Sequence, residues 1–451
     1  MAQPHALTLT QAAAAIRDKE LSPVELTEAL LARIERLEPH LQAWATLAPE
    51  QAMDAARRAE QDAAQGKGDG LLFGVPFGAK DIFDSAGIRT AAGSRVWADR
   101  VPDADAKPIT IAKRAGGILL GKAHTTEFAD GDPAPSRNPW NAEHTPGGSS
   151  TGSGVAVAAR MVPWAFGSQT VGSVLRPAAY NGVVGFKPTF GRISRVGVIP
   201  MATSFDHVGV LTRSVEDAAL LLQALAGYDP DDPYCADVPV ADYVGALGTG
   251  GTPRLGLVKR WFFDEADAET QQQMGETVHR LARAGAIVEE IDPGIDFGYA
   301  YAQHRIMQEA EMAVWHEPLY TPNKQLYGPK ISVYLENGFQ HTARQYVEAL
   351  EYRRTMQRHA EAAMARFDAL LMPTASGPAP KDLTQTGDTR FQSPWSYTGF
   401  PSISLPIGLA TNGLPLGAQL AAPPFQEAQL LRTAYWMEQV LDVQLSPYSG
   451  T

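Results

Sequence analysis

The sequence predicts a single α/β domain in which a mixed, largely parallel β-sheet is covered by helices on both faces. Segments with helical periodicity alternate with short apolar segments, as where Ala268–Ala284 is followed by Ala286–Ile291. This alternation is typical of sheets with crossover helices. No low-complexity segment or convincing linker divides the 451 residues into independent domains.

The composition is that of a globular protein, with 44% hydrophobic and 20% charged residues. A net charge of −12 argues against direct binding to nucleic acid, which normally requires a basic face. The first residues lack the pattern of a secretory signal, and no long apolar run predicts a membrane span. We therefore expect a cytoplasmic protein with no membrane or direct nucleic-acid partner.

Residues 1–70 are expected to form a helical arm packed on the core. Thr10 is a candidate cap for a helix at Gln11–Lys19. Ser22-Pro23-Val24-Glu25 is a capping box with proline at the first helical position, so it predicts a second helix. An alanine-rich third helix is predicted at about Pro49–Ala64.

Residues 71–451 are expected to form the α/β core. The first strand is predicted within Leu72–Ile82. The stretch Thr145–Pro188 holds two glycine-serine clusters, and the apolar segment Gly154–Phe166 between them is expected to be a buried helix. A mostly helical region at about 297–367 is expected to shape a substrate pocket. Later elements are predicted as a helix from Ser214 to Leu225, strands at Ala369–Met372, Ser402–Pro406 and Gly417–Leu420, and a helix at Glu427–Leu441.

Several catalytic motifs are excluded by their context. Ser150 is the centre of a G-x-S-x-G pattern, but the polar loop Asn138–Pro146 precedes it, where a nucleophile elbow needs an apolar strand. The ten histidines form no H-x-H or H-E-x-x-H pattern and Cys235 is the single cysteine, so no protein-built metal site is expected. His124 and His144 are interpreted as structural histidines.

The chemistry that remains is that of lysine and serine. An amine acts as a base only when it is neutral, and burial in an apolar environment lowers the pKa of lysine. Lys80 lies between Phe77 and Ile82 in the apolar strand segment, which suits such a base. A lysine that reaches the surface or pairs with Asp81 is the alternative.

From about Leu21 to Leu441 the sequence resembles the amidase signature hydrolases, which cleave amide bonds. The segments that carry the resemblance occur in the order found in that family. They are Gly74–Asp81, Thr126–Ala129, Thr145–Pro188 and, more weakly, Gly399–Ile403 and Leu414–Leu420.

The resemblance implies a role for three side chains. Lys80 matches the base, and Ser149 matches a bridging serine whose preceding peptide bond is cis in this family. Ser173 follows Ser149 by 24 residues and matches the nucleophile. The resemblance also implies that an oxyanion is bound by the backbone N–H groups of Thr170, Val171, Gly172 and Ser173, and that no cofactor is needed.

The sequence departs from the common family pattern near the nucleophile. Gln169 stands where aspartate is common, and Val171 where glycine is common. Arg176 follows Ser173 by three residues, which resembles a malonamidase-like subgroup whose arginine binds the carboxylate of the substrate. The alternative, that Arg176 pairs internally with an acidic residue, is equally open.

The resemblance implies an amidase that hydrolyses a small carboxamide through an acyl-serine intermediate. The substrate is expected to carry a carboxylate if Arg176 binds it. The alternative is a glutaminase-like subunit of a tRNA-dependent amidotransferase complex, which passes ammonia to a partner subunit. A homodimer is a further hypothesis for the first case.

Overall fold

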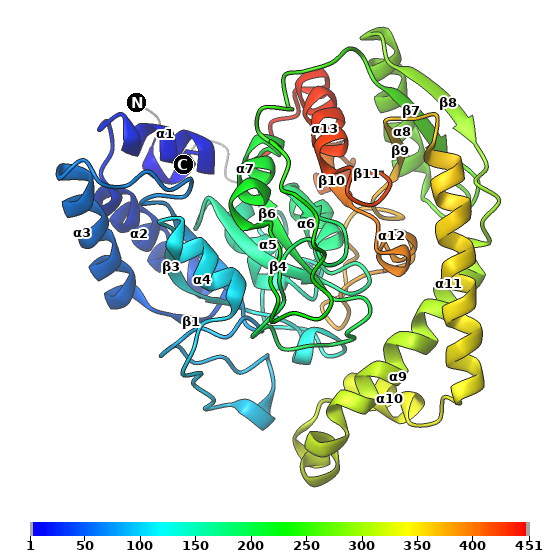
Figure 1. Cartoon of the computed structure of the whole chain (residues 1–451), viewed down its shortest axis with the longest axis horizontal. Coiled ribbons are helices and arrows are strands. Elements are labelled where there is room, and N and C mark those ends of the chain that lie inside the picture. The colour runs from blue at the N-terminus through cyan, green and yellow to red at the C-terminus, as the bar shows by residue number, and fades with distance from the viewer. Residues whose placement is uncertain (1–2, 448–451) are drawn as a thin grey trace.

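An eleven-stranded β-sheet runs through the molecule (Figure 1). The computed structural model describes residues 3–447. Across the sheet the strand order is β1-β3-β2-β4-β6-β5-β10-β11-β9-β7-β8. The strands are β1 Trp44–Leu47, β2 Pro76–Lys80, β3 Ile118–Ala123, β4 Trp164–Gln169, β5 Val184–Lys187, β6 His207–Thr212, β7 Arg254–Val258, β8 Ile287–Ile291, β9 Ala369–Pro373, β10 Ser402–Leu409 and β11 Pro415–Ala421.

The sheet is mixed, as predicted, but it is not largely parallel. The parallel pairs are β2–β3, β2–β4, β7–β8 and β7–β9, and the other six of the ten neighbouring pairs are antiparallel. Parallel neighbours need a long crossover connection, usually a helix, whereas antiparallel neighbours do not. No helix lies between β5 and β6 or between β10 and β11. The parallel pairing expected from the helix–strand alternation is therefore limited to two parts of the sheet, β3-β2-β4 and β9-β7-β8.

Helices flank this sheet. They are α1 Leu9–Arg17, α2 Pro23–Leu41, α3 Pro49–Ala64, α4 Lys107–Arg114, α5 Thr151–Ala158, α6 Leu175–Asn181, α7 Val215–Leu225, α8 Ala268–Arg283, α9 Phe297–Asn323, α10 Pro329–Gly338, α11 Ala343–Met364, α12 Ser393–Thr398 and α13 Glu427–Leu441. Every residue of β4 is buried, so side chains on both faces of the sheet are covered at its centre. At β4, therefore, both faces of the sheet are covered, as predicted.

The N-terminal region is less purely helical than predicted. The capping box of Ser22 and Glu25 opens α2 as expected, but Thr8, not Thr10, caps α1 through its own capping box. Between α2 and α3 lies β1, a strand that was not predicted from the sequence. Because β1 pairs antiparallel with β3, this region contributes an edge strand to the central sheet.

The apolar segment between the two glycine-serine clusters is not one helix. It forms the short buried helix α5 and then turns at Arg160, which has a φ of 57°, into β4. β4 ends at Gln169, inside the second cluster. Small residues permit this close packing: a Cβ on Gly152 would lie 2.1 Å from the carbonyl oxygen of Ala43.

An aromatic core covers the inner strands next to Lys80. Phe77 of β2 stacks on Trp164 of β4 with ring centroids 4.6 Å apart, and Phe83 stacks on Phe166 at 5.2 Å. All four side chains are fully buried. Strand β2 therefore enters an environment without water before it reaches Lys80.

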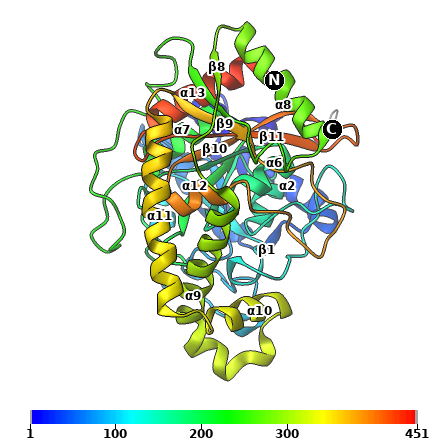
Figure 2. The same ribbon diagram turned by 90° about the vertical axis from the view of Figure 1, so that its right-hand side faces the viewer.

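Helices α9, α10 and α11 form an arm on one side of the molecule, with α10 at the end remote from the sheet (Figures 1 and 2). They occupy the region that the sequence predicts to be helical. Within residues 3–447, no helix combines the length and apolar character needed to cross a membrane.

Candidate active site

Lys80 is the last residue of β2, and its side chain is fully buried. Its Nζ atom lies 2.6 Å from Ser149 Oγ and 2.8 Å from Ser168 Oγ, at hydrogen-bonding distance from both. No carboxylate lies within salt-bridge distance of this amine in the part of the chain that the structure describes. Lys80 thus neither reaches the surface nor pairs with Asp81.

Burial lowers the pKa of Lys80 to about 7. The loss of hydration disfavours the ammonium form, and this effect is larger than the opposing attraction of the Asp206 and Asp130 carboxylates. The positive charge of Arg176 acts in the same direction as burial. At neutral pH a large fraction of this lysine is therefore a neutral amine.

Ser149 lies in the loop before α5, and both sides of its backbone are fixed. The peptide bond between Gly148 and Ser149 is cis, as the resemblance implies. The carbonyl of Gly148 accepts a hydrogen bond from Arg176 Nη2 at 2.6 Å, and the carbonyl of Ser149 accepts one from Thr126 N at 3.3 Å. The Ser149 hydroxyl is thereby held against Lys80.

Ser173 lies just before α6 and is 8% exposed. Its carbonyl accepts a hydrogen bond from Ser150 N at 3.3 Å, which brings the Ser149–Ser150 segment against Ser173. The Ser150 hydroxyl is bonded to the backbone of Ser168. The structure thus brings Lys80 and Ser149 into direct contact, and Ser173 contacts the adjacent Ser150 through its backbone. Within the described residues, no hydrogen bond joins the hydroxyl groups of Ser149 and Ser173.

The buried loop Thr170–Ser173 connects β4 to α6. Val171 O accepts from Ser396 Oγ at 2.7 Å, and Gly172 O accepts from Arg176 N at 3.0 Å. In a trans peptide the next residue's N–H points away from the C=O. The N–H of Gly172 therefore points away from Ser396, and the N–H of Ser173 points away from the backbone N–H of Arg176.

The four backbone N–H groups of this loop have no hydrogen-bond acceptor within residues 3–447. Buried N–H groups without a partner are rare in proteins. Four such groups in succession beside a serine are able to bind an oxygen that carries developing negative charge. Val171 is not among the residues with positive φ, so its β-branched side chain causes no backbone strain there.

Arg176, in α6, is buried and has no acidic partner within residues 3–447. Its guanidinium donates to Gly148 O, to Gly387 O at 3.0 Å and to Thr386 Oγ1 at 3.1 Å. No carboxylate of the described chain lies within salt-bridge distance, so the expected alternative of an internal acidic pair is wrong. Its Nε atom is buried without any partner.

Two site residues were not predicted from the sequence. Ser168 belongs to the second glycine-serine cluster, but nothing in its spacing distinguishes it as a partner of Lys80. Asp206 accepts a hydrogen bond from Thr170 Oγ1 at 2.5 Å and two more from Met201 N and Ala202 N. Burial nevertheless raises the pKa of this carboxyl above its usual range.

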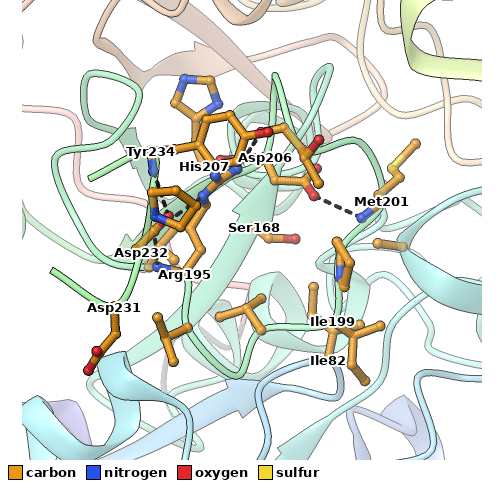
Figure 3. A pocket seen from close by; sticks show the side chains of 17 residues that line it. Ile82, Ser168, Arg195, Ile199, Met201, Asp206, His207, Asp231, Asp232 and Tyr234 are labelled. Atoms are coloured by element: carbon orange, nitrogen blue, oxygen red, sulfur yellow. Dashed lines mark hydrogen bonds and ion pairs between the residues drawn. The ribbon is translucent and has the colours of Figure 1, made fainter. Parts of the chain in front are cut away.

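A cavity of about 260 Å³ lies beside Ser168 (Figure 3). Ser168 and Asp206 supply polar groups to its wall, and Ile82, Ile199 and Met201 supply apolar ones. Ser168 also bonds the Lys80 amine, but Lys80, Ser149 and Ser173 are not among the residues that line the cavity.

Helix α9 contacts the loops around the site. Gln308 Nε2 donates to Asp130 Oδ2 at 2.9 Å, and Tyr301 Oη lies 3.2 Å from Thr389 Oγ1. Residues 301 and 308 are about two turns apart, so these contacts come from one face of the helix. No residue of the region 297–367 lines the cavity beside Ser168, so the expected part of this region in shaping a pocket stays a prediction.

The chain is similar to known proteins over nearly its whole length. The family model described as "Amidase" matches residues 25–431. A glutamyl-tRNA(Gln) amidotransferase subunit from Azotobacter vinelandii is 37% identical, covering 97% of this chain and 98% of the relative.

Solved structures also match over nearly the full length. The native peptide amidase from Stenotrophomonas maltophilia has a TM-score of 0.85 and 30% identity, covering 98% of this chain and 99% of that one. A 6-aminohexanoate cyclic dimer hydrolase complexed with its substrate has a TM-score of 0.86 and 27% identity, covering 97% and 98% of the two chains.

The hydrogen bond from Thr170 to Asp206 gives a testable stability difference. We expect Thr170→Val to lower the free energy of unfolding at pH 8 by about 1–3 kcal/mol, because a buried carboxylate loses a donor. Thr170→Ser keeps the hydroxyl and should lose less. At pH 4 the difference should shrink, because a protonated Asp206 has less need of the donor. Urea unfolding at both pH values measures this, and equal losses in the two variants would contradict it.

Proposed function

The chain belongs to the amidase family, whose members are amide hydrolases, and from that premise we propose that it hydrolyses a small carboxamide bearing a free carboxylate. The products are a carboxylic acid and ammonia or an amine. One observation carries the proposal: the buried Lys80 amine lies 2.6 Å from the Ser149 hydroxyl and forms no ion pair with any residue that the structure describes.

In the proposed mechanism, Ser173 Oγ attacks the amide carbonyl carbon. Its proton passes to Ser149, whose own proton passes to the neutral amine of Lys80. The carbonyl oxygen becomes an oxyanion that the unpaired N–H groups of Thr170–Ser173 stabilise. As the C–N bond breaks, Lys80 returns the proton through Ser149 to the leaving nitrogen. Water then attacks the acyl-serine by the same proton route and releases the acid.

Arg176 supports a substrate with a carboxylate. A buried guanidinium without a carboxylate partner is costly, and a substrate carboxylate would supply the missing counterion. Two N–H bonds remain available on the guanidinium, because it makes three hydrogen bonds to Gly148, Gly387 and Thr386. These hydrogen bonds also place Arg176 directly beside the Gly148–Ser149 peptide.

We propose that the cavity beside Ser168 holds the amine part of the substrate. The leaving nitrogen must lie close to Ser149, from which it receives its proton. Since Ser149 and Ser168 flank the same amine, a substituent on that nitrogen would extend toward the cavity. Ammonia and small apolar amines would both fit a space of about 260 Å³.

A second candidate function follows from the curated relatives. Several are named as subunits of glutamyl-tRNA(Gln) amidotransferase, and the match covers 98% of one of them. This favours a subunit that works inside an amidotransferase complex, although those names do not describe a glutaminase. The purified chain distinguishes the two candidates: turnover of simple amides without ATP or a partner supports the first, and turnover only with a partner supports the second.

Ser173 is tested by substitution. We expect Ser173→Ala to lower kcat by more than about 10³-fold and to abolish covalent labelling by a fluorophosphonate, because the nucleophile is lost. Ser150→Ala is the matched control and should still be labelled. Mass spectrometry of the labelled peptide locates the adduct, and an adduct on Ser149 or Ser150 would show that the nucleophile is misassigned.

Lys80 is tested by the pH dependence of kcat/KM. With a pKa of about 7, lysine is neutral above that pH and charged below it. We therefore expect kcat/KM to rise through pH 7 and then to level off. Lys80→Met should remove activity across this range, whereas Lys122→Met, which removes a second buried amine bonded to Thr90, should retain it per folded molecule. A near-normal rate for Lys80→Met at pH 7 would exclude Lys80 as the base.

Arg176 is tested with paired substrates. We expect Arg176→Ala to raise KM by about 10–100-fold for amides with a free carboxylate, because one charge-assisted contact is lost. For neutral amides of the same length, KM should change much less. Arg176→Ala also removes the hydrogen bond to Gly148 O, which should lower kcat for both classes of amide. The informative quantity is therefore the change in KM for carboxylate-bearing amides divided by the change in KM for neutral amides. Thr386→Val removes a neighbouring hydrogen bond without a charge and is the control. Equal changes in KM for both classes would rule out carboxylate binding.

A further inference from the structure

We propose that Gln169 and Ser396 are positioning residues that hold the loop Thr170–Ser173 in the orientation needed for the reaction. The inference rests on the proposed function, because it takes this loop as the oxyanion site. It adds two residues and explains why this chain has glutamine where the resemblance leads us to expect aspartate.

The Gln169 side chain connects the two ends of the loop. It is fully buried, and its Oε1 atom accepts hydrogen bonds from Val174 N at 2.9 Å and Leu175 N at 3.0 Å. Gln169 precedes the loop and residues 174 and 175 follow it. The two hydrogen bonds therefore fix the distance between the loop ends, whatever occupies the loop.

The other end of the amide controls a hydroxyl on a separate helix. Gln169 Nε2 donates to Ser396 Oγ at 3.0 Å, and Ser396 Oγ donates to Val171 O at 2.7 Å. A serine hydroxyl has one proton. Because it accepts from the amide, that proton is directed to the carbonyl in the middle of the loop.

The orientation of Val171 O decides that of Gly172 N–H, since the two groups point in opposite directions across one planar peptide. With Val171 O held by Ser396, this N–H points away from α12. Gln392 packs on the same peptide so closely that a Cβ on Gly172 would lie 2.4 Å from Gln392 Oε1. A rotated peptide would also leave Val171 O buried without a donor.

The direction of these bonds requires an amide at position 169. Oε1 faces two backbone N–H groups, so the nitrogen must face Ser396. An ionised carboxylate has no proton to donate. It would instead accept the Ser396 proton and take it away from Val171 O. In its ionised form, Gln169→Glu therefore reverses one hydrogen bond with almost no change in shape.

The experiment measures the rate of fluorophosphonate labelling of Ser173, together with kcat and KM for an amide that is turned over. The variants are Ser396→Ala, Gln169→Glu and the control Thr398→Val. Thr398 is a buried residue of α12 whose hydroxyl donates to Pro394 O and does not reach the loop. Thermal unfolding checks that each variant is folded. If Ser396→Ala does not fold, the labelling rate of Gln169→Glu decides the test.

We expect Ser396→Ala and Gln169→Glu to be labelled at least about tenfold more slowly than the wild type, because a misoriented oxyanion donor costs rate. Their kcat should fall in step while KM changes by less than about threefold, since the loss is confined to the transition state. Thr398→Val should be labelled at nearly the wild-type rate.

Labelling of folded Ser396→Ala or Gln169→Glu at the wild-type rate would overturn the proposal, as would an equal loss in Thr398→Val. Failure of the proposed function gives a different result. A wild-type protein that is labelled at Ser173 but hydrolyses no amide contradicts that function and leaves the comparison of labelling rates valid.

Discussion

The burial of the Lys80 amine without a carboxylate partner is the constraint on which the rest of the site depends. Two serine hydroxyls are its hydrogen-bond partners in the described chain, and neither compensates for the lost hydration of an ammonium ion. The pKa therefore falls to about 7. The same three side chains at the protein surface would hold a charged lysine that donates to both serines and accepts from neither.

The sheet provides this environment through the parallel pairing of β2 and β4. Ala79 lies opposite Phe166, so the next residues along both strands bring Lys80 toward Ser168. The aromatic rings of Phe77, Trp164 and Phe166 exclude water on the way to the strand ends. Beyond that point β4 continues into the loop that ends at Ser173. One pair of strands therefore positions both the proposed base and the segment that carries the proposed nucleophile.

Much of the chain could be predicted from local patterns. The capping box at Ser22, the final helix at Glu427–Leu441 and the identity of Lys80 and Ser149 as neighbours follow from signals within a few residues or from the resemblance. The strand β1 could not, because four residues between two strong helices carry too little periodicity. Its formation depends on pairing with β3, which is a tertiary contact.

The contacts that support the site could not be predicted from the sequence, because they also depend on tertiary structure. Gln169 and Ser396 are 227 residues apart, and no spacing rule connects positions at that separation. Asp206 likewise reaches Thr170 only through the fold. The absence of an acid beside Arg176 in the described chain is also a three-dimensional property. Sequence patterns and the resemblance thus indicated the candidate catalytic groups, whereas the groups proposed to orient them could be found only in the structure.

The central claim is that Lys80 is a neutral amine near pH 7, and NMR titration of lysine labelled with ¹³C at Cε measures this directly. The wild-type spectrum should contain a resonance, absent from Lys80→Met, that titrates with a pKa of about 7. A Lys80 resonance that titrates near the ordinary lysine value of about 10.4 would contradict the account.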